Sequence, residues 1–426
     1  MRANRVASVD LVPTRRFGQV PSLDGLRGVA VMIVVVAHLE IILPLPTLLV
    51  IPGGTVSLDS FFVLSGFLIT VLMLREQGAT GRVRKLAFYE RRILRLYPAL
   101  LFMVVGQVVS AYVTHVSFHE EWTSVLSVLF YYSNWKLAVG SNYFGGHIAN
   151  GFQQVWSLSF EEQFYLVWPW VTVFLLTIRT RLRTVVIALV GAIVLIGIHR
   201  ALLYHGPATW YGIFIRTDTR ADSMLWGALA AHLWIRNKEP KRALPYLATI
   251  GGVFLLVALP LTNTTGAFLY RGGFDAIDVS CAFVILALVN GWRVRRIFEW
   301  RPLVVVGTMS YAIYLWHLPV FFTVAYFDTH WPDAVRVIVS FAATGLLATA
   351  SWHFLERPAL KWKERLAVVG KREVGPLVRS RREPPPPPER TRAPNRGPVT
   401  ADALLRSGFT GTSVDAPGPP PDVGPP

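Results

Sequence analysis

The sequence predicts an all-α membrane protein that crosses the bilayer with about ten helices and keeps both termini in the cytoplasm. Three observations predict this fold class. Hydrophobic residues make up 53% of the 426 residues, and the mean hydropathy is +0.43. Charged residues make up only 16%, whereas a soluble domain has about 25%. The basic residues lie in short clusters between long apolar runs, which is typical of cytoplasmic loops.

The basic clusters set the expected topology. Placing them and the N-terminus on the cytoplasmic side leaves outer connections with few Lys or Arg. The clusters lie at Arg75–Arg95, Arg179–Arg183, Arg236–Arg242 and Arg293–Arg301, and a further one follows Arg357. The ten expected spans lie near residues 28–46, 57–74, 96–114, 156–178, 184–203, 220–236, 244–262, 275–292, 303–323 and 334–354.

The first span follows a polar and basic cytoplasmic segment at residues 1–21, in which no cleavable signal peptide is expected. Arg27 and His38 are eleven residues apart. An α-helix therefore places them on one face, about 16 Å apart. An ionisable residue at the depth expected for His38 is costly and by default marks a function. The alternative is a buried polar residue that only ties two helices together.

The third span is preceded by Arg92 and Arg95, which share one helix face at i and i+3. They are either ligand-binding residues or anchors near lipid headgroups. The following apolar stretch, 122–138, cannot cross the membrane, because Arg179–Arg183 would then lie outside. We expect it to form an outer-face or re-entrant helix, whose backbone ends must be covered by protein.

The fourth span carries Glu161 and Glu162 near its outer end. We expect Glu162 to be an exposed carboxylate at the membrane interface. Arg200 and Arg216 also fall on the outer side and break the charge pattern. Arg220, at the start of the sixth span, is close in sequence to the carboxylates of Asp218 and Asp222. These residues form either a structural ion pair or a contact with the substrate.

The ninth span presents Ser310, Tyr314 and His317 on one face, at i, i+4 and i+7. These residues are expected to form a polar seam between helices or to line a cavity. Ser65 in the second span lacks the G-x-S-x-G pattern of a nucleophile, so we expect a small-residue helix contact there. Cys281 is the only cysteine, which excludes an internal disulfide, and its apolar surroundings favour packing.

The membrane domain is expected to end near residue 364, because apolar periodicity stops there. Residues 365–426 are rich in proline and arginine, with five consecutive prolines at Pro384–Pro388. Such a segment cannot bury enough apolar surface to fold, and prolines favour an extended conformation. We predict a disordered cytoplasmic tail, either simply solvated or resting on anionic lipid.

Seven motifs, in this order, resemble the acyltransferase-3 family of integral membrane O-acyltransferases. They are Ser22–Arg27 with His38, Phe61–Ile69, Arg91–Pro98, Trp156–Tyr165, Asp218–Asp222, Gly307–His317 and Glu356–Pro358. The resemblance implies a ten-helix membrane enzyme that O-acylates sugars and related acceptors. It also points to Glu161 as a catalytic residue beside the base.

Acyl transfer to a hydroxyl needs a general base and a site for the donor. His38 is the candidate base, because an imidazole titrates near neutrality and burial favours the neutral form that a base requires. The guanidinium groups of Arg27, Arg92 and Arg95 suit the phosphates of coenzyme A. The candidate acceptor-binding residues are Asp218, Arg220, Asp222, Tyr314 and His317.

We therefore expect an O-acyltransferase of the cytoplasmic membrane. It would move an acyl group, expected to be acetyl, from cytosolic acyl-CoA to a hydroxyl of a cell-envelope glycan or lipid-linked sugar. The expected partners are membrane lipids and this acceptor, not nucleic acid, because the basic residues form no single patch. No metal is expected, because no His, Asp and Glu have ligand spacing. Two alternatives are acylation of a small molecule such as a macrolide, and transport of lipid-linked sugars.

Overall fold

The computed structural model describes residues 18, 20–43, 54–115, 118–140, 150–178, 180–327 and 330–362. These residues belong to the first of two units, Met1–Gly370. Most of the predicted N-terminal segment and the whole predicted tail lie outside the described residues, so both stay predictions. The described part is helical and contains no strand, and the candidate spans in it make the chain a multi-pass membrane protein.

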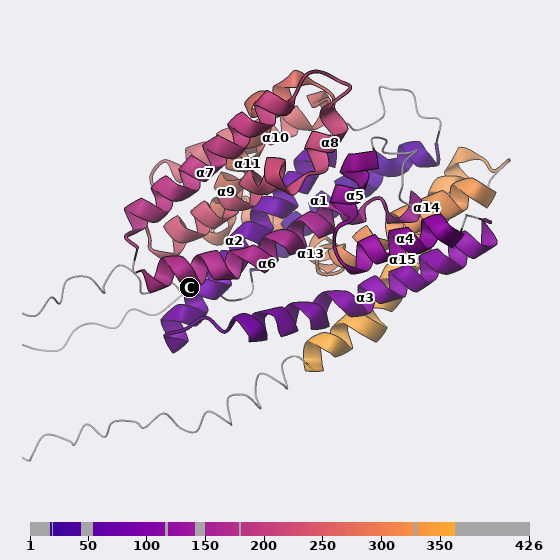
Figure 1. The fold of residues 1–426 in the computed structure, drawn as a ribbon, viewed down its shortest axis with the longest axis horizontal. Coiled ribbons are helices and arrows are strands. Elements are labelled where there is room, and N and C mark those ends of the chain that lie inside the picture. The colour runs from indigo at the N-terminus through magenta and orange to yellow at the C-terminus, as the bar shows by residue number, and fades with distance from the viewer. Residues whose placement is uncertain are drawn as a thin grey trace, which may run out of the picture. The chain divides into compact units, whose positions relative to one another are not determined.

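The N-terminal half contains nine elements (Figure 1). They are α1 (Pro21–Ala37), the 3-10 turn η1 (His38–Ile41), α2 (Gly54–Thr80), α3 (Lys85–Val113), α4 (Phe118–Leu129), α5 (Ser133–Gly140), the 3-10 turn η2 (Asn150–Phe152), α6 (Val155–Thr177) and α7 (Leu182–Leu203).

The C-terminal half contains ten elements. They are α8 (Trp210–Ile215), α9 (Thr217–Ile235), α10 (Leu244–Leu261), the π-helical turn η3 (Leu269–Gly273), α11 (Phe274–Val289), α12 (Arg295–Phe298), α13 (Arg301–Thr308), α14 (Ser310–Phe327), α15 (Asp333–Ser351) and the π-helical turn η4 (Trp352–Glu356).

Each of the ten predicted spans coincides with a helix or a helix pair. Among the described residues, seven helical segments are long and apolar enough to cross a membrane, or eight if α13 and α14 form one broken span. The seven contain α1, α2, α3, α7, α10, α11 and α15. Helices α6 and α9 are not among them; α9 carries three charged residues, Asp218, Arg220 and Asp222, in its first two turns. The number of ten crossings therefore stays a prediction.

The first helix begins earlier than expected. Pro21 occupies its first position, where a missing N–H costs nothing, so α1 starts seven residues before the predicted span. The α-helix ends at Ala37, and His38 opens the tighter turn η1. Arg27 therefore lies within the helix, and His38 lies at its end.

The stretch 122–138 forms two short helices, α4 and α5, of 12 and 8 residues. Neither is long enough to cross a bilayer. The turn between them meets α3 near its middle: the Tyr97 hydroxyl donates to the Leu129 carbonyl at 3.0 Å, and the rings of Tyr97 and Tyr131 lie 5.7 Å apart. Since α4 follows the far end of α3, it runs back along α3. The stretch was expected to form an outer-face or a re-entrant helix, and which of the two it forms stays a prediction.

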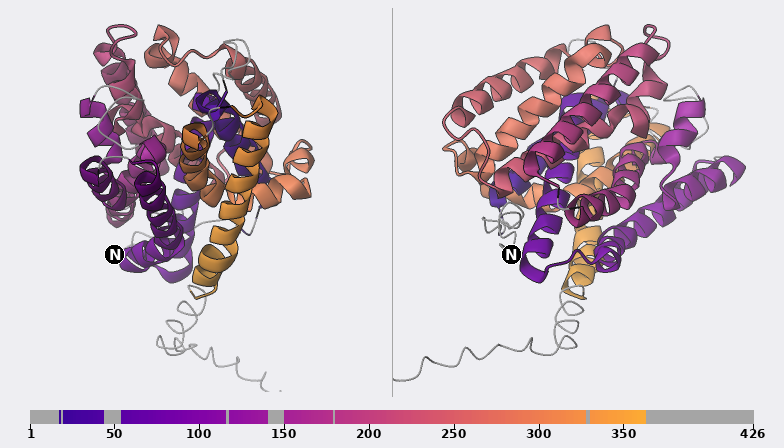
Figure 2. Two further views of the ribbon diagram at one scale, coloured as in Figure 1. Left: turned by 90° about the vertical axis from the view of Figure 1, so that its right-hand side faces the viewer. Right: turned by 60° about the vertical axis from the view of Figure 1, so that its left-hand side comes forward.

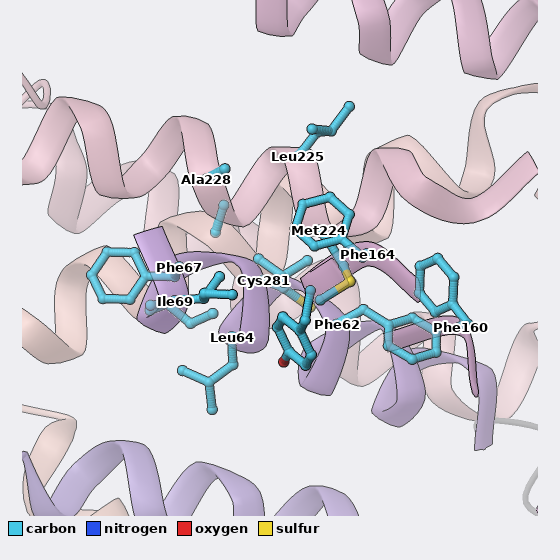
Figure 3. Close-up of a cluster of buried hydrophobic side chains, with 14 of the residues drawn as sticks. Phe62, Leu64, Phe67, Ile69, Phe160, Phe164, Met224, Leu225, Ala228 and Cys281 are labelled. Atoms are coloured by element: carbon cyan, nitrogen blue, oxygen red, sulfur yellow. The ribbon is translucent and has the colours of Figure 1, made fainter. Parts of the chain in front are cut away.

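Helix α2 lies at the centre of the bundle and contacts α1, α6, α9 and α11. Figure 3 shows its side chains Phe62, Leu64, Phe67 and Ile69 among residues of α6, α9 and α11. The closest approach is to α9. A Cβ atom on Gly66 would overlap the Met224 carbonyl, and one on Gly227 would overlap the Val63 carbonyl. Small residues thus allow two backbones to touch, as is common between membrane helices.

Helices α13 and α14 are bent by 70° at Met309, so the predicted ninth span is broken. Figure 2 shows α14 and α15 side by side, and α13 packs against α1. Because of this break, α14 has its own N-terminus at Ser310, and Ser310 lines a cavity.

Candidate active site

A cavity of about 120 Å³ lies between α1, α2, α3, α6 and α14. Its lining consists of Arg27, Leu58, Phe61, Phe62, Ser65, Arg92, Arg95, Leu96, Ser157, Leu158, Glu161, Tyr165, Ser310, Tyr311 and Tyr314. Five of the predicted catalytic and ligand-binding residues therefore meet here, from four different helices: Arg27, Arg92, Arg95, Glu161 and Tyr314.

The three predicted arginines form one cationic wall. Arg27 makes a long contact to Asp24, at 3.3 Å. Arg92 donates Nε and Nη2 to one oxygen of Glu162, at 3.2 and 2.7 Å, and its guanidinium stacks 3.5 Å over the ring of Tyr165. Arg95 is exposed to the cavity, and the described residues offer it neither a hydrogen bond nor an ion pair. The wall therefore holds positive charge that the protein does not fully neutralise.

Helix α14 adds to this wall. Its N-terminus starts at Ser310, which lines the cavity. The first N–H groups of a helix carry no intrahelical partner and a positive partial charge, which favours a bound anion. Guanidinium groups and a helix N-terminus on one cavity are a suitable arrangement for phosphate groups.

Glu161 lies on the same cavity and accepts hydrogen bonds from the Tyr165 hydroxyl, at 3.2 Å, and more weakly from Ser65, at 3.4 Å. Its neighbour Glu162 was expected to be an exposed interfacial carboxylate. That expectation is wrong: the side chain is only 15% exposed, because it pairs with Arg92. The two adjacent carboxylates thus have different surroundings, one facing the cavity and one holding an arginine.

His38 lies close to a second histidine. Its Nδ1 donates to the Val34 carbonyl at 2.8 Å, and its ring centroid lies 5.1 Å from that of His317. His317 in turn donates Nδ1 to the Tyr314 carbonyl at 2.6 Å, and its ring lies 5.4 Å from that of Tyr314. Since a carbonyl only accepts, both rings carry hydrogen on Nδ1 when neutral, and Nε2 carries the lone pair.

His38 is not part of the cavity lining, whereas Tyr314 is. Three rings therefore lead from the cavity to His38: Tyr314, His317 and His38. His317 is fully buried, and its Nε2 has no hydrogen-bond partner among the described residues. The structure thus brings His38, His317 and Tyr314 together at one end of the cavity. For Tyr314 and His317, this was suggested by their position on one face of the same predicted helix.

The remaining predicted acceptor residues lie away from this cavity. Arg220 pairs with Asp59, and both side chains are fully buried. Asp222 accepts from Arg200 at 2.5 Å, and Arg200 also pairs with Asp275 at 2.6 Å. This buried ion-pair network joins α2, α7, α9 and α11. It matches the alternative of a structural ion pair and explains the basic residues Arg200 and Arg220 on the expected outer side.

Asp218 differs from its neighbours in being 37% exposed. It accepts two hydrogen bonds from Arg216, at 2.9 and 2.5 Å, and contacts His199 at 3.1 Å. Asp218 is thus the only one of the three predicted residues on this segment, Asp218, Arg220 and Asp222, whose side chain a solute can reach.

Several cavity residues were not predicted as functional. Ser65 was read as a helix contact, and the glycine beside it, Gly66, makes that contact while Ser65 faces Glu161. Ser157 and Tyr165 are part of the Trp156–Tyr165 motif but were given no role. Their i, i+4 and i+8 spacing with Glu161 on one helix face was the signal that could have found them.

Comparison with known proteins agrees with these observations. Residues 20–353 match the acyltransferase-3 family, described as an acyltransferase domain. The peptidoglycan O-acetyltransferase OatA of Listeria monocytogenes serovar 1/2a is 32% identical over 359 residues, which cover 80% of this chain and 56% of that protein. The O-acetyltransferase OatA of Staphylococcus aureus (strain NCTC 8325 / PS 47) is 30% identical over 357 residues, covering 80% and 57%.

The chain spans a little more than half the length of these curated relatives. No solved structure matches it.

Proposed function

The chain belongs to the acyltransferase-3 family, and on this basis we propose that it is a membrane-bound O-acyltransferase. It moves an acyl group, expected to be acetyl, from cytosolic acyl-CoA to a hydroxyl of a cell-envelope glycan or lipid-linked sugar. The names of its relatives support the class of reaction, and one of them names peptidoglycan as the acceptor. The proposed location is the cytoplasmic membrane, where such acceptors are assembled.

The single observation that carries the proposal is the cationic wall of the cavity. A guanidinium group that lines a cavity without an ion-pair partner among the described residues, as that of Arg95 does, favours a bound anion. Arg27, Arg92 and Arg95 face one space together with the N-terminus of α14. Coenzyme A carries several phosphate groups, and guanidinium forks bind phosphate through paired, charge-assisted hydrogen bonds.

His38 is proposed as the general base. Its Nδ1 hydrogen bond to Val34 keeps the lone pair on Nε2, which is the nitrogen that takes the proton. The hydroxyl oxygen of the acceptor attacks the thioester carbonyl carbon while its proton passes to Nε2. When the C–S bond breaks, the coenzyme A thiolate takes this proton from the imidazolium. The ester and free coenzyme A are the products, and the base is regenerated.

Glu161 is proposed to act on the cavity side. The hydrogen bonds from Tyr165 and Ser65 hold its carboxylate at the lining, where it can accept a hydrogen bond from a hydroxyl of the acceptor. Asp218, exposed in the first turn of α9, is a candidate for an outer contact with the glycan. His317 and Tyr314 lie between the base and the cavity.

The test is transfer by the purified chain in lipid nanodiscs. Acetyl-CoA labelled in the acetyl group is incubated with an envelope extract, and the products are separated and identified. The proposal expects label esterified to a glycan or lipid-linked sugar, and none with the His38→Ala variant. Label on a small-molecule acceptor alone would redirect the proposal to that class. Passage of a labelled lipid-linked sugar across the membrane, without formation of an ester, would favour transport. Broken helices, such as the pair α13 and α14, also occur in transporters.

A further inference from the structure

The proposed reaction lacks one component. Attack on a thioester carbonyl places negative charge on its oxygen, and acyltransferases stabilise this charge with hydrogen-bond donors that are already in position. The arginines are proposed to hold the phosphates, and His38 to take the proton. Neither group is assigned to the carbonyl oxygen, so the donors should be sought among the neutral hydroxyls of the cavity.

Two of these hydroxyls meet across the cavity wall. The Tyr314 hydroxyl, on α14, lies 2.6 Å from Ser157 Oγ, on α6, and both residues line the cavity. The Tyr314 ring is also next to His317, which in turn contacts His38. The pair therefore lies at the end of the cavity that leads to the proposed base.

The hydrogen bonds of this pair leave one hydrogen to spare. The Tyr314 hydroxyl is positioned to donate to the Gln154 carbonyl at 2.8 Å, which uses its only hydrogen. Ser157 then donates either to the Tyr314 oxygen at 2.6 Å or, more weakly, to the same carbonyl at 3.3 Å. Turning the Ser157 O–H toward a ligand therefore costs one hydrogen bond within the pair and leaves Tyr314 satisfied.

We propose that Ser157 is an oxyanion-binding donor of the proposed acyl transfer and that Tyr314 positions its hydroxyl. As the acceptor oxygen bonds to the carbonyl carbon, the electron pair of the C=O bond moves to its oxygen, which accepts a hydrogen bond from Ser157. When the C–S bond breaks, the electron pair returns to form the ester C=O. Neither hydroxyl gains or loses a proton. The inference rests on the proposed function and adds to it one catalytic residue, Ser157, and one positioning residue, Tyr314.

The chain offers matched controls for both hydroxyls. Tyr311 lines the same cavity from the same helix, but its hydroxyl donates to the Leu96 carbonyl at 3.1 Å. Ser159 lies on the same helix as Ser157 and is fully buried, but its hydroxyl pairs with that of Ser133 at 2.6 Å, outside the cavity lining. Tyr311→Phe and Ser159→Ala therefore remove the same groups without touching the proposed oxyanion.

The experiment compares Tyr314→Phe, Ser157→Ala and the double variant with these controls, in the nanodisc transfer assay. Loss of one oxyanion donor lowers kcat by about 10²–10³-fold in enzymes of known mechanism. We expect a fall of about that size in kcat for Ser157→Ala and a smaller fall for Tyr314→Phe, which removes the partner that positions Ser157, with KM for acetyl-CoA unchanged in both. Because the hydroxyls act as one unit, the double variant should lose less than the product of the two factors.

Three results would overturn the inference. One is an unchanged kcat with a raised KM for the acceptor, which would make the hydroxyls acceptor-binding groups. Another is an equal loss in Tyr311→Phe or Ser159→Ala. The third is full kcat once rates are corrected for the folded fraction, measured by thermal unfolding. If the unmodified chain transfers no acyl group at all, the proposed function fails instead, so the two failures are distinguishable.

Discussion

Arg92 and Arg95 lie one helical turn apart on one cavity, yet their removal should have different consequences. Arg95 has no partner among the described residues, so Arg95→Ala removes only a ligand contact. A lost charge-assisted phosphate contact costs about 1.5–3 kcal/mol, or roughly ten- to a hundredfold in Kd. We expect weaker acetyl-CoA binding in a calorimetric titration, with an unchanged melting temperature.

Arg92→Ala should weaken acetyl-CoA binding and also lower the melting temperature, because it leaves the half-buried Glu162 carboxylate without its partner. Arg84→Ala is the control, since Arg84 pairs with Glu76 and is 44% exposed outside the cavity. If Arg92→Ala, Arg95→Ala and Arg84→Ala all bound coenzyme A with equal affinity, Arg92 and Arg95 would be anchors near lipid headgroups and not donor-binding residues.

His38→Ala is expected to abolish acyl transfer while the protein remains folded and inserted. The His38 hydrogen bond to the Val34 carbonyl joins residues only four positions apart, so its loss does not separate elements that are distant in the chain. Activity and the melting temperature are measured on the same nanodisc preparation. Substantial residual transfer would contradict the assignment of the base and would direct attention to His317, whose Nε2 lies buried beside it.

The convergence of the cavity residues was predictable only in part. The i, i+3 spacing of Arg92 and Arg95 follows from helical geometry alone, whereas His38 lies in the turn after the helix that carries Arg27. The pairing of Arg92 with Glu162 joins residues 70 positions apart, and no local pattern reveals it. Glu162 was therefore misread, because its exposure depends on a neighbouring helix that sequence spacing does not specify.

At the scale of helices, the ion-pair network between α2, α7, α9 and α11 should stabilise the bundle and leave the chemistry unaffected. Arg220→Met leaves the fully buried Asp59 without its partner. Breaking such a pair costs about 3–5 kcal/mol. We expect a clearly lower melting temperature, and unchanged kcat in the fraction that stays folded.

Arg216→Met is the matched control for this prediction. The pair of Arg216 with Asp218 is about one-third exposed, and exposed pairs contribute about 0–1 kcal/mol. Its melting temperature should therefore stay close to that of the unmodified chain. If Arg220→Met instead kept its stability and lost acceptor affinity, Arg220 would be a substrate-binding residue as the sequence also allowed.

Helix existence was predictable from apolar runs and charge clusters, and every predicted span coincides with a helix or helix pair. Where the prediction missed, tertiary contacts decided. The bend at Met309 separates α13 from α14, although residues 303–323 read as one apolar run. Helix α1 begins before the predicted span at residue 28 for a local reason, because proline fits a first helical position.

For the whole molecule, the distribution of basic residues decides which side of the membrane each connection faces. Four inner clusters carry most of the Lys and Arg between the predicted spans, and the outer connections carry few. The proposed donor site depends on this orientation, because coenzyme A is a cytosolic molecule and Arg92 and Arg95 belong to the first inner cluster. Topology is thus a test of the mechanism as well as of the fold.

Cysteine labelling in intact cells tests this orientation. Ala79 and Ala267 are both exposed alanines next to the ends of candidate spans, predicted to face the cytoplasm and the outside respectively. Ala267→Cys should react with a membrane-impermeant maleimide in intact cells, whereas Ala79→Cys should react only after lysis. The unmodified chain is the background control, since its single cysteine, Cys281, is buried against Ser60. Labelling of Ala79→Cys from outside would invert the protein, separate the arginine wall from cytosolic coenzyme A, and rule out the acyl-CoA mechanism.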